Sequence, residues 1–323
     1  MGGGTGTFVM LTGLKVYPYH LSAIVTMSDS GGSNKRIRDE FGMLPTSDIR
    51  QCFVALSEEK GRAGLLRKLF MYRFEKGNGI SGMTFGNLFM AALSDIVGSQ
   101  EEAIRQTGKV LRIAGSVIPV SFSHTNLFAT YEDGHTVDEE HLIDEPVHDG
   151  TLRITKMTLK PRPKANPHAI QAIAQADIIT IGPGDLYTSL LPNLLVPGIA
   201  EAIKKSKAKK VFVLNLMTKY GQTYNITAKG HIKIMEKYLG KTLDYIVVND
   251  AQYPKAVLQK YKKLKEFPVV DDLSEKDYYR VIRKPIVAEQ LIEKSQADTL
   301  VRSLIRHDDS KLAKVITEII EEI

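Results

Sequence analysis

The chain has 323 residues, 43% hydrophobic and 25% charged, which is the composition of a globular protein with one large core or two domains. The formal net charge is +6, but lysine and arginine are mixed with acidic residues along the chain, which argues against a nucleic-acid partner. The single cysteine, Cys52, excludes an intrachain disulfide and fits a reducing compartment. Since no run of about 18 apolar residues predicts membrane insertion, we expect a cytoplasmic protein.

A glycine-rich loop opens the chain. Gly3, Gly4, Thr5 and Gly6 precede an apolar run at residues 8–11 that predicts a helix. Glycine lets backbone N–H groups approach a ligand closely, and a helix N-terminus favours anions such as phosphate. Such a loop normally follows a β-strand, whereas only Met1 and Gly2 come before it here. We therefore expect the supporting strand to be absent or truncated, and a flexible terminus is the alternative interpretation.

A second polar loop follows the β-branched run at residues 21–27, which predicts a buried parallel strand. The loop contains Asp29, Gly31, Gly32 and Ser33 and would lie at the carboxyl end of that strand, where open α/β sheets bind ligands. Helices are predicted over the following ranges, the first capped by Ser47 or Asp48 and the last by Ser99: 47–56, 63–72, 85–96 and 101–113.

The pattern changes to short strands between residues 117 and 160, which predicts a small β-rich insertion. Three histidines lie in its acidic part, at positions 135, 141 and 148, but their spacing matches no standard zinc pattern. We therefore predict no metal site in the insertion.

The second half of the chain repeats a strand-then-helix pattern. A helix is predicted at residues 167–175 and a buried strand at 177–181, and that strand runs directly into another glycine loop. The candidate ligand residues of this loop are Gly182, Pro183, Gly184, Asp185, Tyr187, Thr188 and Ser189. The residue pattern favours two interpretations about equally: the loop forms a polar wall of a ligand-binding site, or it is an ordinary βα turn.

Repeated units of this kind predict a Rossmann-like, doubly wound and mainly parallel sheet with helices on both faces. We expect a single domain over residues 1–323, with the β-rich insertion at about 117–160 and a helical segment at about 298–323.

Several stretches, in order, resemble the gluconeogenesis-factor (YvcK-like) family, which is related to the 2-phospho-L-lactate transferases (CofD-like). They are GGGTGT, VTMSDSGGS, IRDEFGMLPTSDIR, FGNLFMAAL, ADIITIGPGDLYTSLLPNLLV, NLMTKYGQT and IRHDDSKLAK. The resemblance implies a regulatory protein that binds a nucleotide sugar, UDP-N-acetylglucosamine in particular. It also implies a link to cell shape and peptidoglycan precursor flow on gluconeogenic carbon sources. Related proteins make a homodimer the expected assembly, and the sequence names no protein partner.

The transferase relatives imply the alternative function. These enzymes move a phospholactyl-type group from a nucleotide diphosphate donor to a deazaflavin alcohol, with the help of a divalent metal. Asp29 would then bind Mg²⁺, assisted by Asp48 or Asp185. Family members usually carry an acidic pair where this chain has Asp29 and Ser30, and they usually begin with a complete strand before the glycine loop. One carboxylate alone binds Mg²⁺ poorly, which favours a protein without turnover and with no certain cofactor.

In the nucleotide-sugar hypothesis, backbone N–H groups of the glycine loops hold the diphosphate. Asp29 or Asn87 would bond to sugar hydroxyls and Arg50 would neutralise phosphate charge. The alternatives are a buried packing role for Asn87 and a surface ion pair with Asp39 or Asp48 for Arg50. NAD(P) binding in the same cleft is compatible with Asp29 after the second strand, but redox catalysis is not predicted, because no histidine or lysine marks a hydride partner.

Overall fold

The structure of the protein is a computed structural model, and it describes residues 1–28, 31, 34, 38, 39, 41–59, 61–289 and 304–322. Of the candidate ligand residues, Asp29, Gly32 and Ser33 lie outside this described part of the chain. The same holds for residues 298–303 of the expected C-terminal helical segment.

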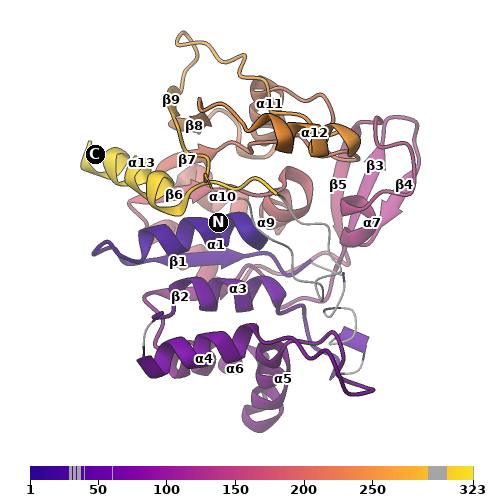
Figure 1. The fold of residues 1–323 in the computed structure, drawn as a ribbon, viewed down its shortest axis with the longest axis vertical. Helices are drawn as coiled ribbons and strands as arrows, with labels where there is room; N and C mark the ends of the chain where they lie inside the picture. Colours follow the sequence, from indigo (N-terminus) through magenta and orange to yellow (C-terminus); the bar gives the residue numbers. More distant parts are fainter. Residues whose placement is uncertain are drawn as a thin grey trace.

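A four-stranded parallel sheet forms one half of the molecule, with the order β6-β7-β8-β9 (Figure 1). Its strands are Ile178–Ile181, Lys209–Val213, Tyr245–Asn249 and Arg280–Lys284. The central strands are buried on both faces. Val211 and Val213 of β7 belong to one core cluster, and Phe212 between them belongs to another. Strands buried in this way read as continuous apolar runs, which is the reason that the sequence revealed them.

Two further parallel strands, β1 (Ser22–Val25) and β2 (Ser116–Pro119), form a second sheet beside the first. Met1 and Gly2 connect the two sheets. Gly2 donates its N–H to Ile24 O at 3.1 Å, and the Met1 amino group donates to Thr180 O of β6 at 2.7 Å. Across this two-residue bridge the strand order is β2-β1-(Met1–Gly2)-β6-β7-β8-β9. This is the order of a doubly wound dinucleotide-binding sheet, in which the first segment of the chain lies at the centre.

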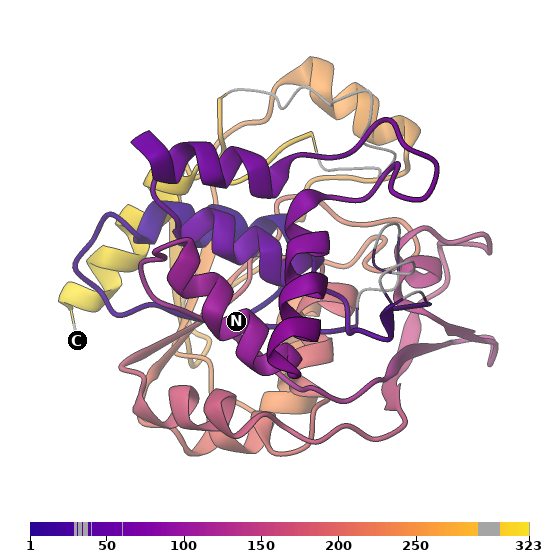
Figure 2. The same cartoon turned by 90° about the horizontal axis from the view of Figure 1, so that it is seen from below.

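Helices cover both faces of this arrangement, as the sequence pattern predicted. On one face, α1 and α13 pack against β7 and β8, and α3 packs against β1. On the other face, α8, α10 and α11 pack against β6, β7 and β8. Figures 1 and 2 show α13 beside α1, although these helices stand at opposite ends of the sequence. The helix bounds are Gly4–Leu14 (α1), Ser47–Leu56 (α3), Gly61–Met71 (α4), Phe85–Val97 (α5), Gln100–Val110 (α6), Glu140–Asp144 (α7), Pro167–Gln175 (α8), Leu191–Leu194 (α9), Ile199–Lys205 (α10), Ala228–Leu239 (α11), Lys255–Lys263 (α12) and Asp309–Glu321 (α13).

The β-rich insertion is a three-stranded antiparallel sheet of order β4-β3-β5, built from Thr136–Asp138, Asn126–Tyr131 and Ile154–Lys160. It lies with α7 at one side of the molecule, away from α13 (Figure 1). The expected start of the insertion at residue 117 is wrong, because β2 pairs in parallel with β1 and so belongs to the main arrangement. Both patterns consist of short apolar runs, so periodicity could not separate them.

Two helix starts test the expected caps. The Ser99 hydroxyl accepts a bond from Glu102 N at 3.3 Å and caps α6, as predicted. The expected cap of α3 by Ser47 or Asp48 is wrong. The Oδ1 atom of Asn34 accepts the Thr46 and Ser47 N–H groups at 3.2 Å each, so the cap comes from a side chain 12 residues before Thr46.

Among the described residues, no single helix is both long and apolar enough to cross a bilayer. One bent pair of helices, Leu186–Leu194 with Ile199–Lys205, meets the criteria of length and composition only.

Candidate functional site

The first glycine loop lies at the centre of the sheet, where the chain leaves Gly2 and enters α1. Gly3 is the N-cap residue of α1 and has an extended backbone, whereas Gly4 has a φ of +63°, which favours glycine. Gly4, Thr5 and Gly6 are half-buried, so this turn remains partly open to solvent. The loop therefore presents the first N–H groups of an 11-residue helix at its open side.

The second glycine loop packs directly against the first. A Cβ atom placed on Gly6 would lie 2.1 Å from the carbonyl oxygen of Pro183, far inside any real contact. On the second loop, Gly182 has a φ of +83°, and the N–H of Gly184 donates to Oδ1 of Asn215 at 3.1 Å. The two loops that sequence analysis selected separately are thus in backbone contact.

A π-helix, η1 (Leu186–Leu190), follows the second loop and continues into α9. Its N-cap residue is Asp185, whose side chain makes no capping bond. Wide helical turns of this kind are rare and occur frequently at functional sites. The first N–H groups of η1 therefore belong to the second loop, just as those of α1 belong to the first.

One buried side chain forms hydrogen bonds to the segments that flank both glycine loops. Asn193 is fully buried, and its Nδ2 atom donates to Gly2 O at 3.3 Å and to Ser189 O at 2.9 Å. Sequence analysis missed this residue. The only signal was its place as a polar residue inside the apolar run LLPNLLV.

The start of α3 approaches the first loop from another side. A Cβ atom on Gly3 would lie 2.5 Å from Oδ2 of Asp48 and 2.8 Å from Thr26 Cγ2. At the end of β1, the buried hydroxyls of Thr26 and Ser28 lie 2.9 Å apart. Asp48 therefore borders the glycine loop, and its predicted role, like that of Asp29, stays a prediction.

Arg50 and Asn87 form a buried pair beside this helix start. The Arg50 Nε atom donates to Asn87 Oδ1 at 3.2 Å, and Nη1 donates to Met71 Sδ at 3.0 Å. Arg50 is 4% exposed and Asn87 is fully buried, so both side chains lie below the surface of the protein. Their expected contacts with phosphate and sugar stay predictions.

The polar residues after the second glycine loop separate into different environments. Tyr187 lies in the core, where burial raises the pKa of its hydroxyl and where this hydroxyl donates to Ile154 O at 3.4 Å. The expected ligand contact of Tyr187 is therefore not favoured, because its ring points from η1 into the core, toward Ile154 of β5. Thr188 is buried near Gln222, whereas Ser189 is half-buried and faces Gly4.

Lys219 connects the second loop to the β-rich insertion. Its Nζ atom lies 2.9 Å from Asp144 Oδ1 and 3.6 Å from Asp185 Oδ2. Burial alone would lower the pKa of Lys219, but Asp185 and Asp144 raise it above its ordinary value. Burial raises the pKa of Asp185, which Lys219 partly offsets. Nearby, burial raises the pKa of Glu266 to about 7.

The Mg²⁺ site that the transferase alternative would need stays a prediction, because Asp29, its main candidate ligand, lies outside the described residues. No group of three or more His, Cys, Asp or Glu side chains in this part of the chain is arranged to hold a metal ion. Asp185, one of the proposed ligands, is engaged by Lys219.

Comparison with known proteins places this geometry in a family. The model of the family described as 2-phospho-L-lactate transferase CofD matches residues 1–287. The chain belongs to the CofD family. A putative gluconeogenesis factor of Aquifex aeolicus is 44% identical over 99% of this chain and 95% of its own length. The gluconeogenesis factor of Bacillus subtilis is 38% identical over 99% and 97%. These full-length relatives confirm the resemblance that the sequence motifs indicated.

A solved structure agrees with the fold of this CofD-family chain. The crystal structure of a Bacillus halodurans protein has a TM-score of 0.87 and 39% identity, and the match covers 98% of this chain and 97% of that one. The predicted fold class is confirmed. The sequence motifs of the family located the glycine loops, but they did not reveal Asn193, Asn215 or the partners of Lys219. These residues act through contacts between distant segments.

Proposed function

We propose that this chain is a cytoplasmic regulatory protein that binds a nucleotide sugar, with UDP-N-acetylglucosamine as the first candidate. The observation that carries the proposal is the contact between two glycine loops at the point where the strand order reverses. Open α/β sheets bind nucleotides in this crevice, beyond the carboxyl ends of the strands. The gluconeogenesis-factor relatives support a regulatory role in carbon metabolism, and the link to cell shape and peptidoglycan precursors is part of the same proposal.

The charge of the crevice supports a diphosphate ligand. The N-termini of α1 and η1 meet at Gly6 and Pro183, and each helix start carries partial positive charge on its unpaired N–H groups. Lys219 is already neutralised by Asp144 and Asp185, so backbone groups rather than this lysine would hold the phosphates. Asp48 borders Gly3 and Ser189 borders Gly4, and in this proposal both side chains bond to sugar or ribose hydroxyls.

Calorimetric titration and thermal-shift measurements test the proposal. UDP-N-acetylglucosamine, UDP-glucose, GDP, NAD(P) and inorganic phosphate are compared, and a UDP-sugar at about 100 times its Kd should add about 2.7 kcal/mol of stability. Thr5→Val removes a hydroxyl at the first turn of α1, and we expect it to weaken binding. Thr12→Val makes the same change further along α1 and serves as the control. No thermal shift with any UDP-sugar at millimolar concentration would refute the proposal.

The transferase alternative has its own assay, motivated by the description of the matching family. Purified protein, Mg²⁺, a guanosine- or uridine-linked donor and an alcohol acceptor are incubated together. Transfer of a phospholactyl-type group would replace the regulatory proposal by an enzymatic one. Binding of a UDP-sugar without any transfer would support the regulatory proposal.

A further inference from the structure

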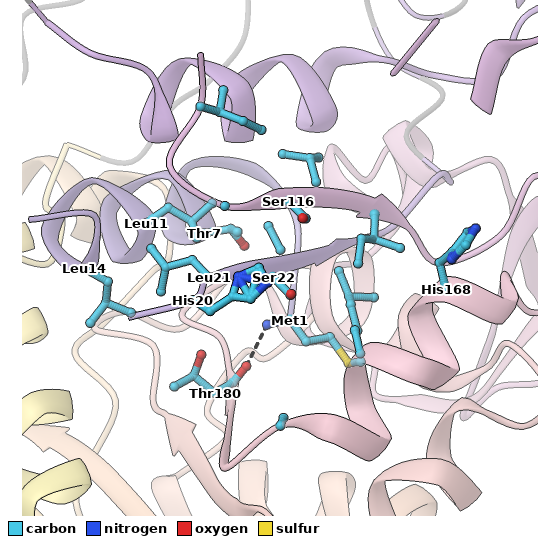
Figure 3. Close-up of a pocket in the computed structure, with 18 of the residues that line it drawn as sticks. Met1, Thr7, Leu11, Leu14, His20, Leu21, Ser22, Ser116, His168 and Thr180 are labelled. Atoms are coloured by element: carbon cyan, nitrogen blue, oxygen red, sulfur yellow. Dashed lines mark hydrogen bonds between the residues drawn. The ribbon is translucent and has the colours of Figure 1, made fainter. Parts of the chain in front are cut away.

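The structure has an internal cavity and an external apolar surface that lie apart from each other. The cavity, of about 1140 Å³, separates β1 from β6, and Figure 3 shows Met1 and Thr180 across from Leu21 and Ser22. None of the described residues of α4 lines this cavity. The apolar side chains of α4 lie instead on the outside of the molecule, at the end opposite the four-stranded sheet (Figure 1).

The outer face of α4 carries large side chains in contact with solvent. Leu65 is 70% exposed, Leu69 is 40% exposed and Tyr72 is 53% exposed. Their spacing of four and three residues places them on one side of the helix and of its last turn, where Tyr72 N–H donates to Leu69 O at 3.0 Å. Phe70 points the other way and is fully buried against two phenylalanine rings of α5. We call Leu65, Leu69 and Tyr72 the α4 ridge.

A glycine-rich loop extends the α4 ridge beyond the helix. The loop closes where Phe74 N–H donates to Met83 O at 2.9 Å and Gly82 N–H donates to Phe74 O at 2.7 Å. Every residue from 75 to 82 is exposed, and Ile80 lies among glycines with positive φ at positions 77, 79 and 82. Figures 1 and 2 show this loop beside the end of α4. The loop therefore presents a further apolar side chain to solvent.

The charge around this surface is positive. Residues 60–74 contain five lysine and arginine residues and no acidic one. Lys68 of α4 and Lys76 of the loop are exposed, with Glu75 as the acidic residue beside them. Arg67 is turned toward the protein, because its Nε atom donates to Val54 O at 3.0 Å. Exposed apolar side chains and exposed lysines thus occupy the same face.

This combination is typical of a helix that lies in the interface of a membrane. Apolar side chains enter the boundary between headgroups and acyl chains, and lysines are attracted to anionic headgroups. A second copy of the chain fits this face less well, because a two-fold interface sets the same surface against itself and brings like charges together. With 11 residues, α4 is too short to cross a bilayer and would lie in its plane.

We infer that the α4 ridge, with Ile80 and the two exposed lysines, docks this protein reversibly on a membrane surface that contains anionic lipids. The apolar side chains contribute burial, and the lysines contribute charge attraction. The inference rests on the exposure and charge of residues 65–80, and it does not depend on which ligand the glycine loops bind.

Cosedimentation of the full chain with lipid vesicles tests the docking. The vesicles contain phosphatidylcholine alone or phosphatidylcholine with about 30% phosphatidylglycerol. The chain should bind the anionic vesicles about tenfold or more tightly than the neutral ones. Salt at about 0.5 M should remove most of that difference. Lack of binding to anionic vesicles at millimolar lipid would overturn the proposal.

Matched apolar substitutions assign the binding to α4. Leu65→Gln combined with Leu69→Gln should lower the affinity for anionic vesicles by about tenfold or more, because two apolar side chains no longer enter the interface. Val147→Gln combined with Val270→Gln is the control, since these valines are 91% and 62% exposed and lie outside α4 and its loop. Equal losses in the two double variants would refute docking through the α4 ridge.

The lysines have their own matched pair. Lys68→Gln combined with Lys76→Gln should lower the affinity by about tenfold or more, since one lysine at an anionic surface contributes about fivefold. Lys204→Gln combined with Lys207→Gln removes the same charge at the end of α10 and should change the affinity less than about twofold. Equal losses would mean that net charge alone attracts the chain, which contradicts a defined docking face.

A tryptophan reporter gives a readout at the ridge itself. The chain contains no tryptophan, so Leu65→Trp places a single indole on the ridge and Val147→Trp places one in the β-rich insertion. On anionic vesicles, the emission of the Leu65→Trp chain should shift to shorter wavelengths and be quenched by brominated lipids, whereas the Val147→Trp chain should keep its spectrum. An unchanged Leu65→Trp spectrum on vesicles that bind the chain would overturn the proposal.

Sedimentation equilibrium without lipid tests the second copy as the occupant. A dimer that dissociates when Leu65→Gln and Leu69→Gln are introduced would overturn the proposal, because another copy of the chain would then cover the α4 ridge. We expect these substitutions to leave the sedimentation of the lipid-free chain unchanged.

Discussion

The two glycine loops have similar sequences but are held in different ways. The first is preceded by two residues, which bond to β1 on one side and β6 on the other. The second follows a complete strand and is fixed further by Asn215 and by the contact of Asp185 with Lys219. A glycine loop gains its position from the elements behind it, so the second loop should tolerate perturbation better than the first. The following predictions test this difference, beginning with the largest effect.

Gly6→Ala should be the most damaging small substitution in the site. Its Cβ would lie 2.1 Å from Pro183 O and 2.5 Å from Pro183 C, and backbone atoms cannot move aside as a flexible side chain can. We expect a loss of about 3 kcal/mol in the free energy of unfolding, together with loss of nucleotide-sugar binding. Urea unfolding and calorimetry measure the two effects.

Gly4→Ala and Gly42→Ala are the matched controls for this clash. They have φ values of +63° and +62°, and neither has backbone close to the added methyl group. Each should cost about 1–2 kcal/mol from the left-handed conformation alone. If Gly6→Ala costs no more than these controls, the loops are not held in contact in solution.

Lys219→Met should be the next largest effect and tests the support of the second loop. The change leaves Asp144 and Asp185 close together without their cation. With side chains 22–35% exposed, solvent screens part of this penalty, so we expect a loss of about 2 kcal/mol at pH 8. The loss should shrink as the pH falls, because burial raises the pKa of Asp185 and this carboxylate then takes up a proton.

Urea unfolding of this variant at pH 8 and pH 5 measures both the size and the pH dependence. Lys229→Met is the control, because it removes a more exposed pair with Asp277 at 3.7 Å and should cost less than about 0.5 kcal/mol. A loss at Lys219 that is as small as the control would mean that the ion network does not support the second loop.

Acetylation of the Met1 amino group tests the first loop through its pH dependence. Burial lowers the pKa of this group from 8.0 to about 6, so the unfolded chain binds more protons than the folded chain between these pH values. The stability of the chain with a free amino group should therefore fall as the pH drops from 8 to 6, by about 1–2 kcal/mol.

The acetylated chain should not show this component, because an amide carries no titrating proton. The difference between the two chains, followed by urea unfolding across pH 6–8, cancels the contributions of Glu266 and of the other titrating groups that both chains share. Parallel pH curves for the two chains would show that the amino group is not buried in solution.

Local patterns predicted most of the second half of the molecule. Pro167–Gln175 matches its predicted bounds, because a proline at the first turn marks the start of the helix within a few residues. The strand before Gly182 was visible as a short β-branched run. The glycine loops themselves were found in the same way, because glycine and polar residues interrupt apolar runs.

The supports of the site could not be predicted locally. Asn34 caps α3 from 12 residues before Thr46, and Lys219 meets Asp144 from 75 residues away in sequence. Tyr187 was expected at the ligand because it follows the glycine loop, yet the wide turns of η1 direct it to the core. In each case tertiary contact decides the role, and one sequence contains no record of such contacts.

The smallest predicted effect concerns Asn215, which accepts a hydrogen bond from the second glycine loop and lies beside the proposed ligand site. Asn215→Ala removes the acceptor for the Gly184 N–H and should cost about 1 kcal/mol of stability. Asn215→Asp keeps an acceptor oxygen at the same place, so its stability should remain close to that of the parent chain. The new carboxylate would lie beside the N-terminus of η1, where an anionic ligand is proposed to bind, and should lower affinity for UDP-sugars by about tenfold. Urea unfolding should therefore find Asn215→Ala the less stable variant, whereas calorimetry should find Asn215→Asp the weaker binder of UDP-sugars. Equal losses of stability in the two variants would mean that Asn215 acts by packing alone. The second glycine loop would then be held by β6, just as the first glycine loop is held by Met1 and Gly2.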